Sequence, residues 1–212
     1  SGSPDMVALP VPPGSGRVAI SPSGTAAALY YAETGSVTVL TGLPENLSVN
    51  RNSEISFAGT VASLAVSDDG ATLLAASTDG AVWRIPSGGV ARILTQASSP
   101  SLGFLFRSAD AVIADAASGA VVMSRSADPP GQLIALGGPA EGVSRLVALA
   151  VSSDNRSVLV ANSEPAGVVR LSLEGGAPVS TPCNCRVAAL EPLGGGEVFR
   201  ISPPGETPLW LL

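Results

Sequence analysis

Apolar residues in this chain occur in runs of about four to seven, and clusters of Ser, Asp, Gly and Pro separate the runs. Within residues 63–85, the clearest stretch, three apolar strands alternate with the turn pairs Asp69-Gly70 and Asp79-Gly80. Gly and Asp accept the positive φ angles that tight hairpin turns require. The apolar positions do not recur at the spacing of a helix face. The pattern therefore predicts strands joined by hairpins and almost no helix.

The same plan of strand, turn, strand, turn and strand recurs along the chain, which indicates a repeat architecture. The first turns of the five copies end at Gly24, Gly70, Asp110, Asn155 and Gly195. These turns are 40 to 46 residues apart, which matches the roughly 40–45 residues of a four-stranded propeller blade. A fourth strand is expected in each gap, at residues 54–57, 91–95, 132–136 and 177–180.

The repeat predicts one all-β domain over residues 1–212, a β-propeller with five blades of four antiparallel strands. The expected blades are 17–58, 59–98, 99–138, 139–182 and 183–212 plus 5–10. The fifth copy lacks a fourth strand, whereas a spare apolar segment, 6–9, precedes the first copy. Placing this segment beside 208–212 in the last blade closes the ring and removes two exposed edges. The alternative is that the chain is a piece of a larger propeller.

The copies at 63–85 and 149–171 resemble bacterial YVTN-type repeats, which are relatives of WD-repeat propellers. In that pattern a turn leads into a strand that ends in Val-Ala-Asn, as at 160–162, and a Val-rich strand follows, as at 168–171. The Trp-Asp pair and the structural His of WD repeats are absent. The resemblance implies a binding or scaffold role, in a secreted or periplasmic protein, and it implies no catalytic residue.

Composition excludes several classes of function. The 212 residues include no His, and all 11 basic residues are Arg, so a Ser-His-Asp triad, a His metal ligand and a Schiff-base Lys are excluded. The net charge of −6 argues against a nucleic-acid or anionic-membrane partner, because both require a basic face. No apolar run reaches the roughly 18 residues that span a bilayer.

These exclusions favour a non-catalytic propeller that presents loops or a central channel to a small molecule or a protein partner. The alternative is a lactonase- or glycosidase-like propeller hydrolase with carboxylates at the channel mouth. No cofactor or metal is expected. Asp residues recur at the turns, where Asp is common because its side chain accepts local backbone hydrogen bonds. These residues are Asp68, Asp69, Asp79, Asp110 and Asp154.

Three arginines form the best candidate ligand site. Arg17, Arg145 and Arg186 each precede an innermost strand of a different blade, so we expect them at one mouth of the central channel. Guanidinium groups gathered there would hold a small anionic ligand. The alternative is that these arginines are solvated, or paired with acidic residues nearby in sequence, namely Asp5, Glu141 and Glu191.

The two cysteines, Cys183 and Cys185, are separated by one residue. Zinc requires four ligands, and a redox dithiol usually has two intervening residues, so neither site is expected. A turn at Asn184 would bring the two sulfur atoms close enough for a local disulfide. A disulfide is expected if the protein is exported, and we expect an extracytoplasmic location, although the chain carries no signal peptide.

Overall fold

The computed structural model describes residues 16–54, 60–129, 131–192 and 198–201, and they form antiparallel sheets joined by short loops. The first sheet contains β1 (Gly16–Ile20), β2 (Ala26–Tyr31), β3 (Ser36–Thr41) and β4 (Ser48–Glu54). The second contains β5 (Val61–Val66), β6 (Thr72–Ser77), β7 (Ala81–Pro86) and β8 (Arg92–Gln96). Each sheet keeps sequence order, because every strand pairs with the strand that follows it.

The chain then repeats this plan twice and begins a further sheet. The third sheet contains β9 (Pro100–Phe104), β10 (Ala111–Asp115), β11 (Val121–Ser124) and β12 (Ile134–Gly137). The fourth contains β13 (Leu146–Val151), β14 (Ser157–Ser163), β15 (Ala166–Ser172) and β16 (Val179–Pro182). The fifth sheet pairs β17 (Glu191–Pro192) with β18 (Phe199–Arg200). One 3-10 turn, η1 (Pro139–Glu141), is the only helical element in these residues.

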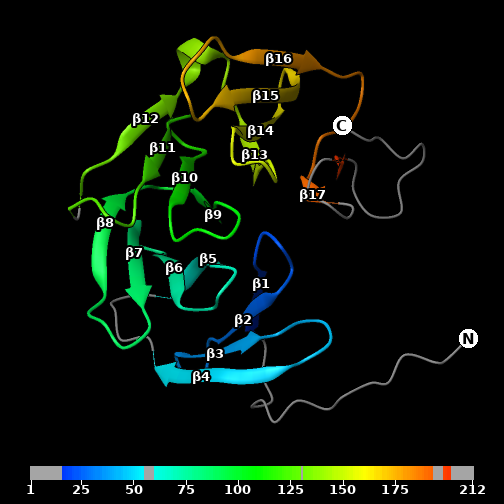
Figure 1. Cartoon of the computed structure of the whole chain (residues 1–212). Helices are drawn as coiled ribbons and strands as arrows, with labels where there is room; N and C mark the ends of the chain where they lie inside the picture. The colour runs from blue at the N-terminus through cyan, green and yellow to red at the C-terminus, as the bar shows by residue number, and fades with distance from the viewer. Residues whose placement is uncertain (1–15, 55–59, 130, 193–197, 202–212) are drawn as a thin grey trace, which may run out of the picture.

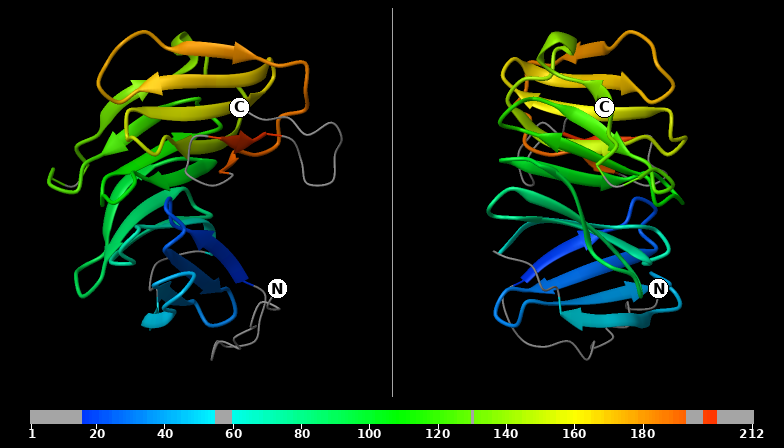
Figure 2. Two further views of the ribbon diagram at one scale, coloured as in Figure 1. Left: turned by 45° about the vertical axis from the view of Figure 1, so that its right-hand side comes forward. Right: turned by 90° about the vertical axis from the view of Figure 1, so that its left-hand side faces the viewer.

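The sheets follow one another around an arc, with β1, β5, β9 and β13 on the inside (Figure 1). The left view of Figure 2 shows the first sheet and the described part of the fifth at the two ends of this arc. Consecutive sheets pack face to face through four apolar clusters. This arrangement of four-stranded sheets confirms the all-β, propeller-like architecture that the repeat predicts.

The turns form as the sequence pattern predicts. In the first hairpin of the second sheet, the Ser67 hydroxyl donates to Asp69 Oδ1 over 2.6 Å. The N–H of Ala71 donates to the same carboxylate, and Gly70 takes a φ of +68°. In the next hairpin Asp79 accepts from Ser77, and Gly80 has a φ of +92°. The Asp side chains and the Gly φ angles therefore form the tight turns between the strands of this sheet.

The last residues of the four inner strands differ in how far the described residues cover them. Val66 and Phe104 are each 1% exposed and Val151 is 6% exposed, because each packs against the preceding sheet. Ile20 holds the same position at the end of β1, yet it is 69% exposed. Val18, two residues earlier on the same side of β1, is 67% exposed. No described residue therefore covers Ile20 and Val18 on the face of the first sheet that points away from the second sheet.

The fifth unit is described only in part. Its β17–β18 hairpin corresponds to the two inner strands of a blade, so five complete blades are not seen. The predicted third strand at 208–212 and the closing strand at 6–9 lie outside the described residues. The closed five-bladed ring therefore stays a prediction.

The strand predicted at 54–57 shares only residue 54 with β4, which spans Ser48–Glu54, and its other residues lie outside the described part. The fourth strand of the first sheet therefore lies earlier in the chain than predicted. The sequence of β4 is rich in Ser and Asn, so the apolar pattern does not mark it as a strand. As the edge strand of its sheet, β4 pairs on one side only, with the largely buried β3. An outer strand with a solvated face tolerates polar residues.

Candidate functional site

A pocket of about 400 Å³ lies on the face of the fourth sheet that meets the fifth. The inner part of this face is covered, since Ala161 and Val168 are buried against the fifth sheet. The covering apolar residues are Val187, Leu190, Phe199 and Ile201. Farther out, Arg170 and Thr181 are exposed and Val179 is 47% exposed. Among the described residues, the two strands of the fifth sheet cover only part of this four-stranded face.

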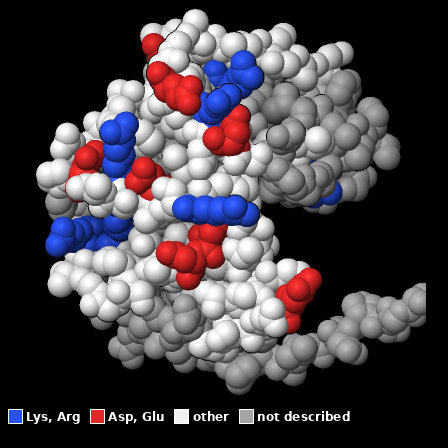
Figure 3. Space-filling model, in the orientation of Figure 1, with Lys and Arg blue, Asp and Glu red and all other residues white. Residues whose placement is uncertain are grey.

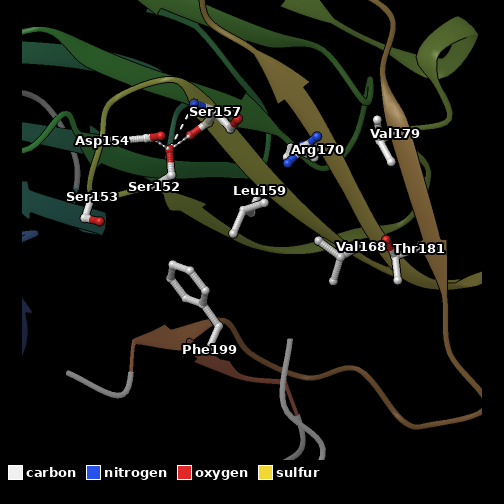
Figure 4. Close-up of a pocket in the computed structure, with 10 residues that line it drawn as sticks. All are labelled: Ser152, Ser153, Asp154, Ser157, Leu159, Val168, Arg170, Val179, Thr181 and Phe199. Atoms are coloured by element: carbon white, nitrogen blue, oxygen red, sulfur yellow. Dashed lines mark hydrogen bonds between the residues drawn. The ribbon is translucent and has the colours of Figure 1, made fainter. Parts of the chain in front are cut away.

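Strand register fixes the order of side chains across the pocket. Leu159 of β14 lies opposite Arg170 of β15, which lies opposite Val179 of β16. Figure 4 shows the Phe199 ring of β18 facing Leu159 across the pocket, with Arg170 between Leu159 and Val179. Side chains two residues apart on a strand share a face, so Val168 lines the pocket beside Arg170. One guanidinium therefore stands beside an apolar floor.

A hydrogen-bonded turn forms the rim of the pocket at one end of β14. The Ser152 hydroxyl donates to Asp154 Oδ1 over 2.6 Å and accepts from the N–H of Ser157. The N–H of Arg156 also donates to Asp154 Oδ1. The bond from Ser152, followed by the bond from Arg156, holds the pKa of Asp154 below its ordinary value. Asp154 is therefore an ionised residue committed to its turn.

Arg170 makes no hydrogen bond or ion pair with any residue in the described part of the chain. A guanidinium carries five N–H donors in a planar fork, which suits carboxylate, phosphate and carbonyl oxygens. The oxygen Oδ1 of the acidic rim residue, Asp154, already accepts bonds within its own turn. Among the described residues, no side chain or carbonyl therefore occupies the donors of Arg170.

Two of the three predicted channel arginines form a hydrogen bond or an ion pair within the described part of the chain. Arg17 lies in β1, and its Nε donates to the carbonyl of Val61 in the second sheet over 2.9 Å. It also lines a second cavity of about 350 Å³. Arg145 precedes β13 and forms a 2.7 Å ion pair with Glu164, with both side chains about 70% exposed. Such an exposed pair contributes little to stability.

The acidic partner of Arg145 differs from the residue that sequence proximity suggested. Glu141 instead accepts from the N–H of Gly138 at the 3-10 turn. Arg186 lies just before the fifth sheet and is exposed, and it takes part in an interaction. Asp5 lies outside the described residues, and so does the side chain of Glu191. The anion site formed by the three arginines stays a prediction.

Cys183 and Cys185 form a disulfide in the connection between the fourth and fifth sheets. Their Cα atoms are 5.2 Å apart, which lies within the usual range for a disulfide. Both cysteines pack against the cluster that joins these two sheets. Among the described residues, no group of three or more His, Cys, Asp and Glu residues is placed to hold a metal.

One turn carboxylate joins neighbouring sheets. Asp68 Oδ1 accepts from the N–H and hydroxyl of Ser23 in the first sheet, and Oδ2 accepts from the N–H of Arg107 in the third. Burial opposes ionisation, but the bonds from Arg107 and Ser23 outweigh it, so the pKa of Asp68 is lowered. Asn155 joins the fourth sheet to the third through two bonds to the backbone of Phe106. These contacts stabilise the arc.

Figure 3 shows acidic and basic side chains interspersed over the described part of one face of the molecule. In that part, no helix is long and apolar enough to cross a bilayer.

Comparison with known proteins supports the fold. No family model matches the chain, and no curated protein matches it. A solved structure, the β-propeller domain of Myceliophteria thermophila Cps50 (Swd1), superposes with a TM-score of 0.67 at 14% sequence identity. The match covers 90% of this chain and 62% of that domain. The chain is similar in fold to a β-propeller. The narrower resemblance to YVTN-type repeats stays a prediction.

Sequence reasoning missed Arg170, although a signal for it was present. The third strands of the second and fourth repeats read Val-x-Arg followed by an apolar residue, at 82–85 and 168–171. An Arg on the side of a strand that should face the next blade is unusual, because apolar residues are expected there. The same exception occurs in both copies, so the sequence alone could have singled out this position.

Proposed function

We propose that this chain is a non-catalytic β-propeller that binds an unknown protein or small anionic ligand in the pocket on the fourth sheet. The observation that carries the proposal is Arg170, an exposed guanidinium beside an apolar floor with no partner among the described residues. Ligand sites typically combine an apolar lining with a few placed polar groups. A guanidinium fork recognises carboxylate and phosphate groups.

The hydrolase alternative has less support. A carboxylic acid that donates a proton near neutral pH needs a raised pKa. Where the pKa of an Asp in the described residues is shifted, it is shifted downwards, as at Asp68, Asp79, Asp115 and Asp154. Downward shifts suit carboxylates that accept turn hydrogen bonds, and such carboxylates do not hold a proton near neutral pH.

An extracytoplasmic location belongs to the same proposal. The disulfide between Cys183 and Cys185 supports it, because disulfides persist in oxidising compartments and are rare in the cytosol.

The test is a titration with isovalerate, an anion with a branched apolar part, followed by NMR of the full-length protein. We expect signals from Leu159, Val168 and Val179 to shift, because the carboxylate meets Arg170 while the methyl groups meet the apolar floor. Isovaleramide, a neutral analogue of the same shape, should bind more weakly. The variant Arg170→Gln should lose the preference for the anion.

A variant that lacks the three channel arginines is the control. Its substitutions are Arg17→Gln, Arg145→Gln and Arg186→Gln. We expect it to bind isovalerate as the wild-type protein does. If the anion binds only when these arginines are present, the site is at the channel mouth. If no signal around Arg170 shifts in the wild-type protein, the proposed function is wrong.

A further inference from the structure

The disulfide between Cys183 and Cys185 joins residues that are only two positions apart, so it does not fasten distant parts of the fold together. A disulfide stabilises a protein chiefly by restricting the unfolded chain, and this restriction grows with the length of the loop that the bond closes. Here the loop contains a single intervening residue, Asn184. The disulfide is therefore a weak structural cross-link.

The chain around the disulfide is held in place by contacts that do not depend on the S–S bond. The N–H of Cys183 donates to the carbonyl of Ala166 over 3.0 Å, which continues the pairing of β15 with β16. Two residues after Cys185, Val187 is buried in the cluster between the fourth and fifth sheets. Both cysteines pack against the same cluster. The two sulfur atoms should therefore stay close together when the bond is reduced.

The disulfide is accessible to a thiol that approaches from solvent. Each cysteine is only half-buried, and Asn184 between them is exposed, as are Thr181 and Pro182 before them. The spacing of one residue counted against a redox pair in the sequence, because such pairs usually have two intervening residues. Exchange depends, however, on access to a sulfur atom and on how firmly the fold stabilises the bond. Both features of this disulfide favour exchange.

We infer that the disulfide between Cys183 and Cys185 is a redox site that oxidises the dithiol of a partner molecule. A thiolate of the dithiol attacks one of the two sulfur atoms and forms a mixed disulfide, while the other cysteine leaves as a thiolate and takes up a proton. The second thiol of the partner, after losing its proton, attacks the partner's own sulfur in the mixed disulfide. The partner leaves with an internal disulfide, and both cysteines remain as thiols.

Each protein molecule accepts two electrons and two protons from the dithiol in this reaction, so no further oxidant or reductant enters the step. The partner is identified by its chemistry, as a dithiol, and it is either a small molecule or a protein. The reaction takes place at the connection between the fourth and fifth sheets and is separate from ligand binding at Arg170.

The equilibrium with a dithiol measures how firmly the fold stabilises the bond. By linkage, the fold stabilises the disulfide by as much as the disulfide stabilises the fold. The test equilibrates the full-length protein with set ratios of reduced to oxidised dithiothreitol, and an oxidised synthetic peptide of residues 180–188 is the reference. Acid quenching, alkylation and mass spectrometry give the reduced fraction. We expect the two equilibrium constants to agree within about tenfold, because so short a loop contributes little to the fold.

Resistance to reduction would overturn the inference. If the disulfide in the protein is more than about a hundredfold harder to reduce than the disulfide in the peptide, it is a structural cross-link. The inference also fails if dithiothreitol and reduced thioredoxin, a protein dithiol, both reduce the peptide but leave the protein oxidised. Reaction with dithiothreitol alone assigns a small-molecule dithiol, and a faster reaction with thioredoxin assigns a protein dithiol.

Serine variants test access to the sulfur atoms in the folded protein. Cys183→Ser and Cys185→Ser each leave one thiol, and we expect at least one of these thiols to form a mixed disulfide with oxidised glutathione. The double variant is the control: it should take up no glutathione and oxidise no dithiol, while its melting temperature should fall by only a few degrees. If neither single variant forms a mixed disulfide, the sulfur atoms are inaccessible and the inference is wrong.

Discussion

Arg170 and Arg84 occupy the same position in two different sheets, yet their surroundings are opposite. Arg84 is half-buried and donates to two carbonyls of the third sheet. Arg170 is exposed and donates to no described residue. Burial lowers the pKa of Arg84, and the charge of Asp110 opposes that shift. Arg84 therefore has a structural role in the second sheet, whereas Arg170 in the fourth sheet is the residue that we propose binds a ligand.

We expect Arg84→Ala to destabilise the protein by about 1–3 kcal/mol, because two carbonyls between sheets lose their donor. Arg170→Ala is the matched control, and it should change the free energy of unfolding by no more than about 0.5 kcal/mol. Urea denaturation of both variants measures the difference. Equal losses would mean that Arg170 is also held inside the fold.

The pair Ile20 and Phe104 tests whether the first sheet is covered. Phe104→Ala should cost about 3–5 kcal/mol, because Phe104 fills the interface between the second and third sheets. Ile20→Ala should cost less than about 1 kcal/mol, because Ile20 is 69% exposed. Thermal melts of both variants give the comparison. A loss at Ile20 that approaches the loss at Phe104 would show that another part of the chain closes the ring.

In the variant Asp68→Asn, the free energy of unfolding should depend less on pH in the acidic range. The pKa of Asp68 in the folded protein lies below the ordinary value of 3.8, because the bonds from Arg107 and Ser23 outweigh the effect of burial. A lowered pKa stabilises the fold above the unfolded value, and this stabilisation is lost as pH falls through the folded value.

The wild-type protein should therefore be more stable than Asp68→Asn at pH 7, and the difference should shrink below about pH 4. Urea titrations at pH 7, 5, 4 and 3 test this. A difference that is constant across the series would contradict an ionised Asp68 as the link between the sheets.

Reduction of the disulfide should have a small effect on stability. Cys183 and Cys185 close a ring of three residues, so the chain-entropy model gives a loss of about 1.5 kcal/mol on reduction. Ellman's reagent should detect no thiol before reduction and two afterwards, and the melting temperature should fall by a few degrees. Two free thiols in protein purified without reductant from an oxidising compartment would contradict the disulfide.

Much of the fold was predictable because its signals are local. Asp69-Gly70 and Asp79-Gly80 specify tight turns through the φ angles they accept, and these turns set the strand lengths. The repeat spacing then predicts four-stranded sheets in sequence order. The edge strand β4 was misplaced because it pairs on one side only, so a period of alternating apolar residues is not required of it.

The candidate site was harder to predict, because it depends on which faces are covered. The sequence by itself determined the hairpins, the four repeated sheets and the presence of an Arg at equivalent positions in β7 and β15. Only the tertiary structure decided that Arg84 is half-buried beside the third sheet, while Arg170 is exposed at a pocket. Whether a side chain is covered depends on how whole sheets pack against each other. Residues far apart in the chain meet in that packing, as Leu159 and Phe199 do.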